Sequence, residues 1–310
     1  MTQKLVIIGN GMAPGRMLEN LFETAPGLYD VTIFNAEPRV NYDRIMLSPV
    51  LSGEKEFEEI VIHGDGWYIK HGITLYKGHR IVAIDRARKT VTSDHGLIES
   101  YDKLVIATGS VPFIIPVPGK DLRGVITYRD LDDVQAMLLA AQSREKAVVI
   151  GGGLLGLEAA AGLAGRGMDV TVLHVMPTLM DRQLDPAAGY LLQKELEDRG
   201  IKVLCKANTK AIVGDGKVEG VELDDGRIIP ATLVVMAVGI RPSVALAKDA
   251  GLAVNRGIVV DEGMLTSDGN IMALGECAEV AGQVYGLVAP LYEMARVAAA
   301  SLLGDGTARY

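Results

Sequence analysis

Residues 147–156 read Ala-Val-Val-Ile-Gly-Gly-Gly-Leu-Leu-Gly and decide the fold. The apolar run predicts a buried β-strand, and the glycines that follow it predict a tight turn. Leu157 to Gly165 has a helical pattern, and Val170 to Leu173 predicts a further strand. A strand, a glycine turn, a helix and a second strand in this order form a βαβ unit.

The glycines of this turn have the spacing G-x-G-x-x-G. The first glycine of that motif makes the turn, the second lets the backbone approach a pyrophosphate, and the third lets the helix pack close to the sheet. The unpaired N–H groups of the helix N-terminus favour the phosphates. We therefore expect a dinucleotide to contact Gly151, Gly153, Leu154, Leu155 and Gly156.

The same pattern occurs at the start of the chain. Lys4 to Ile8 predicts a strand, a helical pattern ends near Thr24, and Asp30 to Phe34 predicts the next strand. The first turn, residues 9–15, reads Gly-Asn-Gly-Met-Ala-Pro-Gly, and residues 35–53, which contain two prolines, predict a loop. One glycine motif is weak evidence, but two in the same context favour two dinucleotide-binding units.

The first turn departs from the motif at one position. Pro14 stands where the third glycine is expected, and proline is tolerated in a first helical turn because its missing N–H would be unpaired there. Gly15 could supply the close approach instead. We expect the cofactor of this unit to contact Gly9, Gly11, Met12 and Ala13.

An acidic residue after the second strand of such a unit usually binds the adenosine ribose. In the first unit Asn35 ends the strand and Glu37 follows it, so we expect Glu37 to be the main contact and Asn35 a lesser donor. The alternative is that Glu37 is a solvated loop carboxylate. In the second unit the strand ends in His174, which we expect to contact the dinucleotide. Because His174 is not an acid, the choice between NADH and NADPH stays open. NADH is favoured only because no arginine cluster follows, Arg182 being the nearest.

Two stretches predict domain boundaries. Residues 112–119 are rich in proline, and residues 239–242, which read Gly-Ile-Arg-Pro, close a buried strand. We therefore expect an α/β protein with two Rossmann-like domains. The first domain comprises residues 1–114 and 244–310, and the second domain, residues 115–243, is inserted into it.

Composition excludes several classes of protein. The formal net charge of −8 argues against nucleic acid or an anionic membrane as the main partner. The only cysteines, Cys205 and Cys277, cannot form a disulfide scaffold or hold a four-cysteine iron–sulfur cluster, and no metal site stands out. We expect both to be inert buried thiols. Low cysteine content and the lack of a long apolar stretch predict a soluble cytoplasmic protein.

Three further motifs accompany the two glycine turns in a fixed order: Ala107-Thr108-Gly109 lies between the turns, and residues 239–242 and Gly275-Glu276-Cys277-Ala278 follow the second turn. Over nearly the whole chain this order resembles the flavoprotein reductases of the pyridine nucleotide–disulfide reductase superfamily. The chain is most similar to the FAD/NADH module that begins the large subunit of assimilatory, siroheme-containing nitrite reductases. Besides the two glycine turns, the resemblance rests on residues 37–44, 157–160, 177–180, 183–185 and 285–293.

The resemblance implies that the first unit binds FAD and the second binds NADH or NADPH. Arg44 would contact the FAD pyrophosphate, Glu158 would face the nicotinamide, and Gly239 would belong to the NAD(P)H site. A surface arginine and a helix-stabilising carboxylate are the alternatives for Arg44 and Glu158. Glu276 stands where the family has an aspartate one methylene shorter. The resemblance implies further FAD contacts at Ala107, Thr108, Gly109, Gly275, Glu276, Leu287 and Val288.

The resemblance also implies the path of the electrons. Ile45 occupies the place where single-cysteine relatives carry their redox cysteine, so we expect no disulfide reduction. The electron acceptor would be an iron–sulfur or siroheme centre in a downstream domain or in a separate protein, with nitrite as the final substrate. The usual C-terminal interface domain has no counterpart before residue 310. The alternatives are a stand-alone rubredoxin or ferredoxin reductase and a non-catalytic, redox-sensing nucleotide-binding module.

Overall fold

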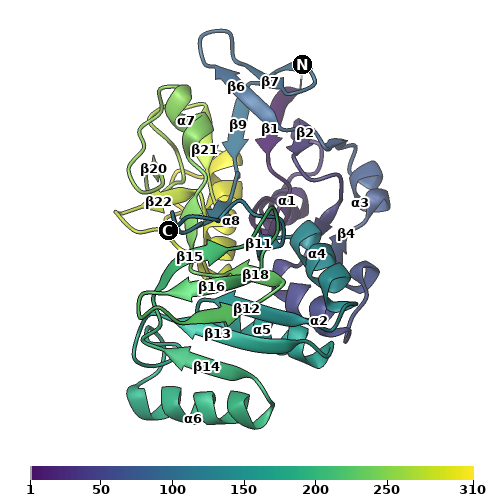
Figure 1. Cartoon of the computed structure of the whole chain (residues 1–310). Coiled ribbons are helices and arrows are strands. Elements are labelled where there is room, and N and C mark those ends of the chain that lie inside the picture. Colours follow the sequence, from purple (N-terminus) through teal and green to yellow (C-terminus); the bar gives the residue numbers. More distant parts are fainter. Residues whose placement is uncertain (1) are drawn as a thin grey trace. The chain divides into compact units, whose positions relative to one another are not determined.

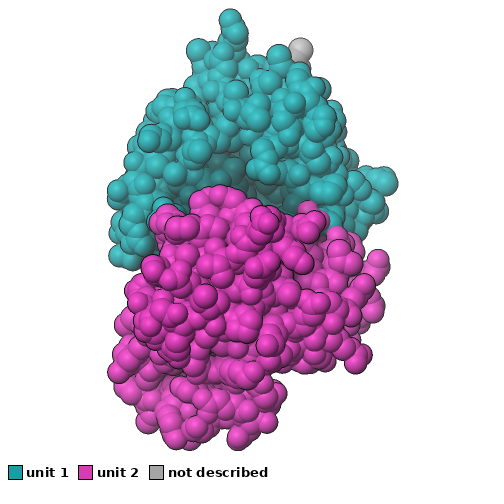
Figure 2. Space-filling model, viewed as in Figure 1, with its two compact units in different colours: residues 1–43, 61–111, 241–310 teal, residues 44–60, 112–240 magenta. Residues whose placement is uncertain are grey.

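A computed structural model describes residues 2–310 (Figure 1). The chain folds as two compact units, coloured separately in Figure 2. Unit 1 comprises Met1–Asp43, Val61–Val111 and Arg241–Tyr310, and unit 2 comprises Arg44–Ile60 and Pro112–Ile240. These divisions lie near the boundaries expected at residues 114 and 243, but residues 44–60, which we expected in the first domain, pack in unit 2.

The centre of unit 1 is a five-stranded parallel sheet with the strand order β21-β9-β1-β2-β5. Its strands are β1 (Gln3–Ile8), β2 (Tyr29–Asn35), β5 (Thr74–Lys77), β9 (Lys103–Ile106) and β21 (Ile271–Ala273). The predicted strands and the first helix are found within a few residues of their expected ends. Buried aliphatic side chains of β1 and β9 form the middle of the core.

Helices and small sheets complete unit 1. The helices are α1 (Met12–Thr24), α3 (Asp65–Lys70), α7 (Ala245–Asp249) and α8 (Val288–Leu302). Helices α1 and α8 pack together. The small sheets pair β3 (Asn41–Tyr42) with β4 (Val61–His63), β20 (Ile258–Val260) with β22 (Ala278–Val280), and β6 (Ile81–Asp85) with β7 (Thr90–Ser93) and β8 (Ile98–Ser100).

Unit 2 repeats the plan with a parallel sheet of order β11-β18-β12-β13-β14. Its strands are β11 (Val125–Thr127), β12 (Lys146–Ile150), β13 (Asp169–His174), β14 (Lys202–Cys205) and β18 (Leu233–Met236). A three-stranded antiparallel sheet contributes β15 (Thr209–Val213), β16 (Gly220–Leu223) and β17 (Ile228–Pro230). The short strands β10 (Ser110–Pro112) and β19 (Ile240–Pro242) contain the points where the chain passes between the units. The predicted α/β fold class with two Rossmann-like units is confirmed.

The helices of unit 2 include α4 (Leu131–Ala141), α5 (Leu154–Gly165), which the sequence predicts, and α6 (Pro186–Asp198). Helix α6 begins at a capped N-terminus, where the Asp185 carboxylate accepts a hydrogen bond from the Ala188 N–H and Pro186 is the first helical residue. Helix α5 packs on β12, β13 and β18, which places its N-terminus at the end of the sheet where these strands finish.

The prediction of a loop at residues 35–53 is wrong for the second half of this stretch, which is helical. Two 3₁₀ turns (Arg44–Met46 and Phe57–Ile60) flank a helix, α2 (Leu47–Ser52), that packs on α5. A β-carbon on Gly162 would stand 2.7 Å from the Leu51 side chain, so the two helices touch at a glycine. The Arg166 guanidinium donates to the Leu51 carbonyl at 2.9 Å. A six-residue helix that contains a proline has little stability alone, and these tertiary contacts explain it.

Candidate dinucleotide sites

The turn between β12 and α5 requires glycine at its first and third motif positions. Gly151 has a φ of +127°, and a β-carbon there would lie 2.2 Å from the Ala237 carbonyl oxygen. A β-carbon on Gly156 would lie 2.0 Å from the Gly151 carbonyl oxygen. Both distances are far below van der Waals contact, so a side chain at either position would displace backbone. The turn is therefore closed against the end of β18 and against its own helix.

The second motif position is open instead of crowded. Gly153 is the N-cap of α5 with a φ of −87°, and no side chain caps the helix. A β-carbon on Gly153 would have no atom within 4 Å. Leu154 and Leu155 begin the helix, whose first N–H groups have no partner within it. An anionic group can therefore reach the positive end of α5 at Gly153, which fits a pyrophosphate.

The turn between β1 and α1 in unit 1 has the same geometry. Gly9 has a φ of +107°, and a β-carbon there would lie 2.2 Å from the Ala107 carbonyl oxygen. Gly11 is the uncapped N-cap of α1 with a φ of −80°, and a β-carbon on it would have no atom within 4 Å. Met12 and Ala13 begin the helix. The residues present thus fit a second pyrophosphate.

Matching hydrogen bonds fix the two turns. Gly9 N–H donates to the Phe34 carbonyl and Gly151 N–H donates to the Leu173 carbonyl, each at 2.8 Å. In each case the acceptor is the second-last residue of the next strand. The departure at Pro14 is tolerated in the buried first turn of α1. Gly15 does make a close approach, but towards the Asn41 side chain, from which a β-carbon would be 2.9 Å away.

A buried polar network beneath the first turn was missed from the sequence. Asn41 is fully buried and donates its amide to the carbonyl oxygens of Asn10, at 3.0 Å, and Gly11, at 2.6 Å. The Tyr68 hydroxyl contacts the Asn10 side chain at 2.9 Å and accepts from the Asn41 N–H at 3.3 Å. This network holds two carbonyls of the turn towards the protein interior. No spacing links Tyr68 to residues 10 and 41 in the sequence, so only the fold reveals it.

We predict that Tyr68→Phe lowers the free energy of unfolding by about 1–3 kcal/mol, because it removes the partner of the buried Asn10 side-chain amide and of the Asn41 backbone N–H. Urea unfolding followed by circular dichroism measures the loss. Tyr190→Phe, at a tyrosine that is 56% exposed, is the matched control and should leave the unfolding midpoint unchanged. A Tyr68→Phe chain as stable as the control would mean that the network contributes nothing.

The other residues expected at the FAD site in unit 1 lie as follows. Asn35 is buried at the end of β2 and donates to the Arg39 carbonyl at 2.8 Å, while Glu37 accepts from the Tyr42 hydroxyl at 2.8 Å. Glu37 thus lies in a loop that is anchored at both ends. Its contact with a ribose stays a prediction.

The segment after β9 is fixed near the first turn. The Thr108 hydroxyl donates to the Ser243 carbonyl at 2.8 Å, and the Ser243 N–H donates to the Gly109 carbonyl at 2.9 Å. Gly109 has a φ of +65°. A β-carbon on Gly275 would lie 3.4 Å from that of Ala13. The structure therefore brings residues 107–109 and Gly275 to the end of unit 1 where α1 begins.

The remaining predicted FAD residues lie in both units. Glu276 accepts a hydrogen bond from the Ser110 hydroxyl at 2.8 Å. Leu287 is the N-cap of α8 and is 70% exposed, and Val288 begins that helix. Arg44 lies in unit 2, where its guanidinium donates to the Arg129 carbonyl at 3.1 Å. Their roles at a flavin are not tested by these contacts and stay predictions.

Glu158 contacts α2 within unit 2. The Ser48 hydroxyl donates to its carboxylate at 2.7 Å and lies 2.9 Å from the Tyr128 hydroxyl. Tyr128 is 2% exposed, and burial raises its pKa to about 12. The carboxylate of Glu158 therefore has a structural contact, and its position at a nicotinamide stays a prediction. Gly239 has a φ of +116°, and a β-carbon there would meet no atom within 4 Å.

His174 lies at the end of β13 as predicted, and it is nearly buried. Its Nδ1 accepts a hydrogen bond from the Gly152 N–H at 3.1 Å, and its Nε2 lies 3.1 Å from Asp181 Oδ1. Since an accepting Nδ1 carries no proton, the proton is on Nε2 and points to the carboxylate. Asp181 was missed from the sequence because it lies seven residues after the strand end.

The two cysteines are free thiols in the structure. Cys277 is completely buried, as predicted, and burial raises the pKa of its thiol. Cys205 is only half-buried, and desolvation, with the charge of Glu197, raises its pKa as well. Both sulfurs therefore stay protonated at neutral pH and are poor nucleophiles. Among residues 2–310 no cluster of histidine, cysteine and acidic side chains could hold a metal ion.

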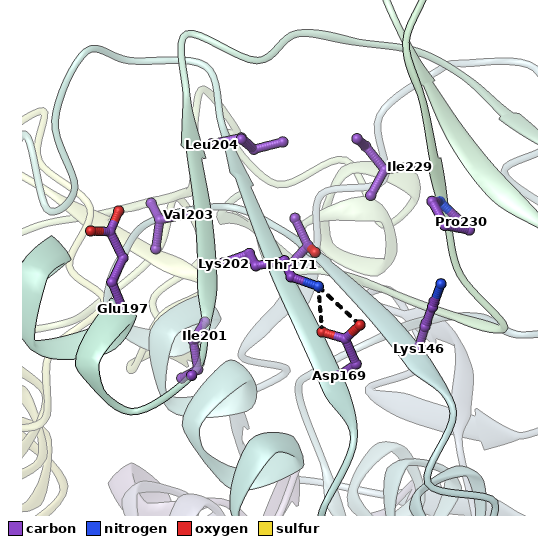
Figure 3. A pocket seen from close by; sticks show the side chains of 11 residues that line it. Lys146, Asp169, Thr171, Glu197, Ile201, Lys202, Val203, Leu204, Ile229 and Pro230 are labelled. Atoms are coloured by element: carbon purple, nitrogen blue, oxygen red, sulfur yellow. Dashed lines mark hydrogen bonds and ion pairs between the residues drawn. The ribbon is translucent and has the colours of Figure 1, made fainter.

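A hollow of about 560 Å³ in unit 2 is lined by none of the glycine-turn residues 151–156, and Figure 3 shows its lining. Lys146, Asp169 and Lys202 stand at the starts of β12, β13 and β14, whereas the glycine turn follows the end of β12. Lys202 and Asp169 satisfy each other in an ion pair at 2.9 Å, as the dashed lines of Figure 3 show. The rest of the lining is mostly aliphatic, so this hollow offers no comparable set of phosphate-binding groups.

Comparisons with known proteins agree with this geometry. Residues 3–301 match the family model described as pyridine nucleotide-disulphide oxidoreductase. The chain is 50% identical over 99% of its length to "Nitrite reductase [NAD(P)H]" of Bacillus subtilis, and 47% identical over 97% to the "Assimilatory nitrate reductase electron transfer subunit" of the same organism. It spans only 38% and 39% of those two relatives.

The chain is similar to the crystal structure of a ferredoxin reductase from Rhodopseudomonas palustris, with a TM-score of 0.92 and 30% sequence identity. The match covers 99% of this chain and 78% of the reductase chain. No helix within residues 2–310 is long and apolar enough to cross a membrane. The predicted resemblance and the oxidoreductase class are confirmed, and FAD and NAD(P)H are the cofactors of this group of enzymes. The chain belongs to the pyridine nucleotide-disulphide oxidoreductase family.

Proposed function

We propose that the chain is an electron-input module that oxidises NAD(P)H with FAD and delivers the electrons to an iron–sulfur or siroheme centre outside residues 1–310. One observation carries this proposal: two uncapped helix N-termini, each behind a glycine turn of the same backbone geometry, lie in two separate units. FAD in unit 1 and NAD(P)H in unit 2 account for both sites, in the order in which the family uses them.

The side chains of this chain would act as binding and orienting groups. The N–H groups behind Gly11 and Gly153 would hold one pyrophosphate each, and Glu37 would accept a hydrogen bond from the FAD ribose. Bound FAD supplies the redox chemistry, since it accepts a hydride and releases electrons one at a time. Hydride transfer itself requires no acid or base from the protein.

The state of the cysteines supports an acceptor other than a disulfide. Cys277 is sealed in the core and Cys205 is a half-buried thiol with a raised pKa. Neither is the exposed thiol of lowered pKa through which a disulfide reductase forms its mixed disulfide. The similarity to nitrite reductase and to a nitrate reductase electron-transfer subunit supports nitrogen assimilation as the context, with nitrite as the final substrate. A cytoplasmic location and the absence of nucleic acid and membrane partners stay predictions from composition.

A second candidate is a stand-alone ferredoxin or rubredoxin reductase. It is favoured by the fold, because the chain has a TM-score of 0.92 to a ferredoxin reductase that is 30% identical to it. Both functions send electrons to an iron-containing protein and differ in the acceptor. A gene for a cysteine-rich partner or domain beside this one would distinguish them.

Acceptor specificity tests the proposal. We expect the FAD-loaded chain to oxidise NADH with ferricyanide, a one-electron acceptor, and with a ferredoxin. Oxidised glutathione and lipoamide should give no turnover. Turnover with either disulfide would overturn the electron path, and no turnover with any acceptor would favour a redox-sensing module.

A further inference from the structure

We propose that Asp181 binds the adenosine ribose hydroxyls in unit 2 and disfavours the 2′-phosphate of NADPH, so that the chain prefers NADH. The inference rests on the proposed function in one respect, that a pyridine dinucleotide binds the turn between β12 and α5. It adds a specificity residue that the strand-end position, occupied by His174, does not supply.

His174 connects the glycine turn to Asp181. A β-carbon on Gly152 would stand 2.6 Å from the imidazole ring, so the ring lies directly against the turn. The ring accepts from the Gly152 N–H through Nδ1 and donates to Asp181 through Nε2, each at 3.1 Å. The carboxylate is therefore held one ring length beyond the position where a dinucleotide site usually carries its acid.

The Asp181 carboxylate has an oxygen that can accept a hydrogen bond from the ribose diol. Its Oδ1 accepts from His174, and its side chain is 27% exposed while that of His174 is 10% exposed. A carboxylate whose first oxygen is fixed by a hydrogen bond can accept from a ribose hydroxyl through its second oxygen. The same charge repels a phosphate in that place.

Unit 1 also has a polar strand-end residue that bonds the following loop, although there it bonds a backbone carbonyl and not the acid. Asn35 ends β2, is buried and donates to the Arg39 carbonyl, whereas His174, which is also buried, donates to the Asp181 carboxylate. Glu37 follows in the loop that Asn35 anchors. In both units the strand-end side chain forms a hydrogen bond within the protein, and an acidic residue of the next loop lies nearby to contact a ribose.

Arg182 is the competing feature. It is exposed, follows Asp181 directly, and could bind a 2′-phosphate. The hydrogen bond to His174 fixes Asp181 next to the turn, which is why the acid decides the preference. An Arg182→Gln variant separates the two effects.

The test measures binding of ADP-ribose and of 2′-phospho-ADP-ribose to the FAD-loaded chain by isothermal titration calorimetry. These probes lack nicotinamide, so the readout is independent of turnover. We expect ADP-ribose to bind at least tenfold more tightly. Asp181→Asn should weaken ADP-ribose about tenfold and strengthen the phosphorylated probe, whereas Arg182→Gln should keep the preference for ADP-ribose.

Two variants of His174 test its positioning role. In His174→Gln the amide nitrogen replaces Nε2 and can still donate to Asp181, so the preference should survive with weaker binding of both probes. In His174→Asn the amide oxygen replaces Nδ1 and can accept from Gly152, but no group reaches Asp181. The preference for ADP-ribose over the phosphorylated probe should therefore fall as far as it does in Asp181→Asn. If His174 had a purely structural role, both variants would lower the affinities for the two probes by the same factor.

Equal weakening of both probes by Asp181→Asn would overturn this inference alone. A wild-type preference for the phosphorylated probe that Arg182→Gln removes would also overturn it, and would assign specificity to the arginine. A wild-type chain that binds neither probe would contradict the proposed function together with the inference.

Discussion

Gly153→Glu should abolish binding of NADH and NADPH while the chain keeps its FAD and its yellow colour. The φ of −87° suits any residue, and a β-carbon meets no atom within 4 Å, so the side chain fits without strain. Its carboxylate would stand before the helix N-terminus where a phosphate is expected. Two unit charges 4 Å apart repel by about 4 kcal/mol at an effective dielectric constant of 20, which weakens binding roughly a thousandfold.

The matched variant is Gly11→Glu, because Gly11 has the same open position and the same role as N-cap. We expect it to lose FAD and to keep affinity for ADP-ribose. Calorimetry with each ligand, and the absorption spectrum of the purified chains, give both results. If Gly153→Glu loses the yellow colour and Gly11→Glu keeps it, the cofactors are assigned to the wrong units.

The second large effect concerns stability. Gly151→Ala should destabilise unit 2 by about 3 kcal/mol or more, because alanine is strained at a φ of +127° and its β-carbon would lie 2.2 Å from the Ala237 carbonyl oxygen. The backbone must shift at the point where the turn meets the end of β18. Urea unfolding of the full chain, followed by circular dichroism, measures the loss.

Gly153→Ala is the control for this variant. It adds the same methyl group two residues away, in open space and at an ordinary φ. Its unfolding midpoint should stay close to that of the wild type. If the unfolding midpoint of Gly151→Ala equals that of Gly153→Ala, the turn relaxes around the methyl group. The backbone would then not require glycine at position 151.

Local patterns predict the parallel sheets well. The β-branched runs of β1 and β12 and the glycines after them are each sufficient to place a strand and a turn, because all the interactions involved are close in sequence. The same holds for the start of α6 at Asp185 and Pro186, whose capping bond spans three residues. The expected start of α5 at Leu157 was three residues late. The first turn of the helix includes Gly156 of the glycine motif, and glycine has a low helix propensity.

Contacts between distant residues explain what the sequence did not reveal. Helix α2 depends on Leu51 meeting Gly162, more than a hundred residues later. Tyr68 reaches the first glycine turn across 58 residues through a hydrogen bond to Asn10. His174 was expected to bind the cofactor because of its position, but only the structure reveals that both ring nitrogens contact the protein and that Asp181 lies beyond them.

Anaerobic titration of the FAD-loaded chain with NADH tests the central claim most directly. If two dinucleotide sites of one module exchange a hydride, one equivalent of NADH should bleach the flavin absorption of the wild type, and Gly153→Glu should stay yellow. A purified chain that takes up no FAD, or a wild-type chain whose flavin stays oxidised in excess NADH and excess NADPH, would contradict the account.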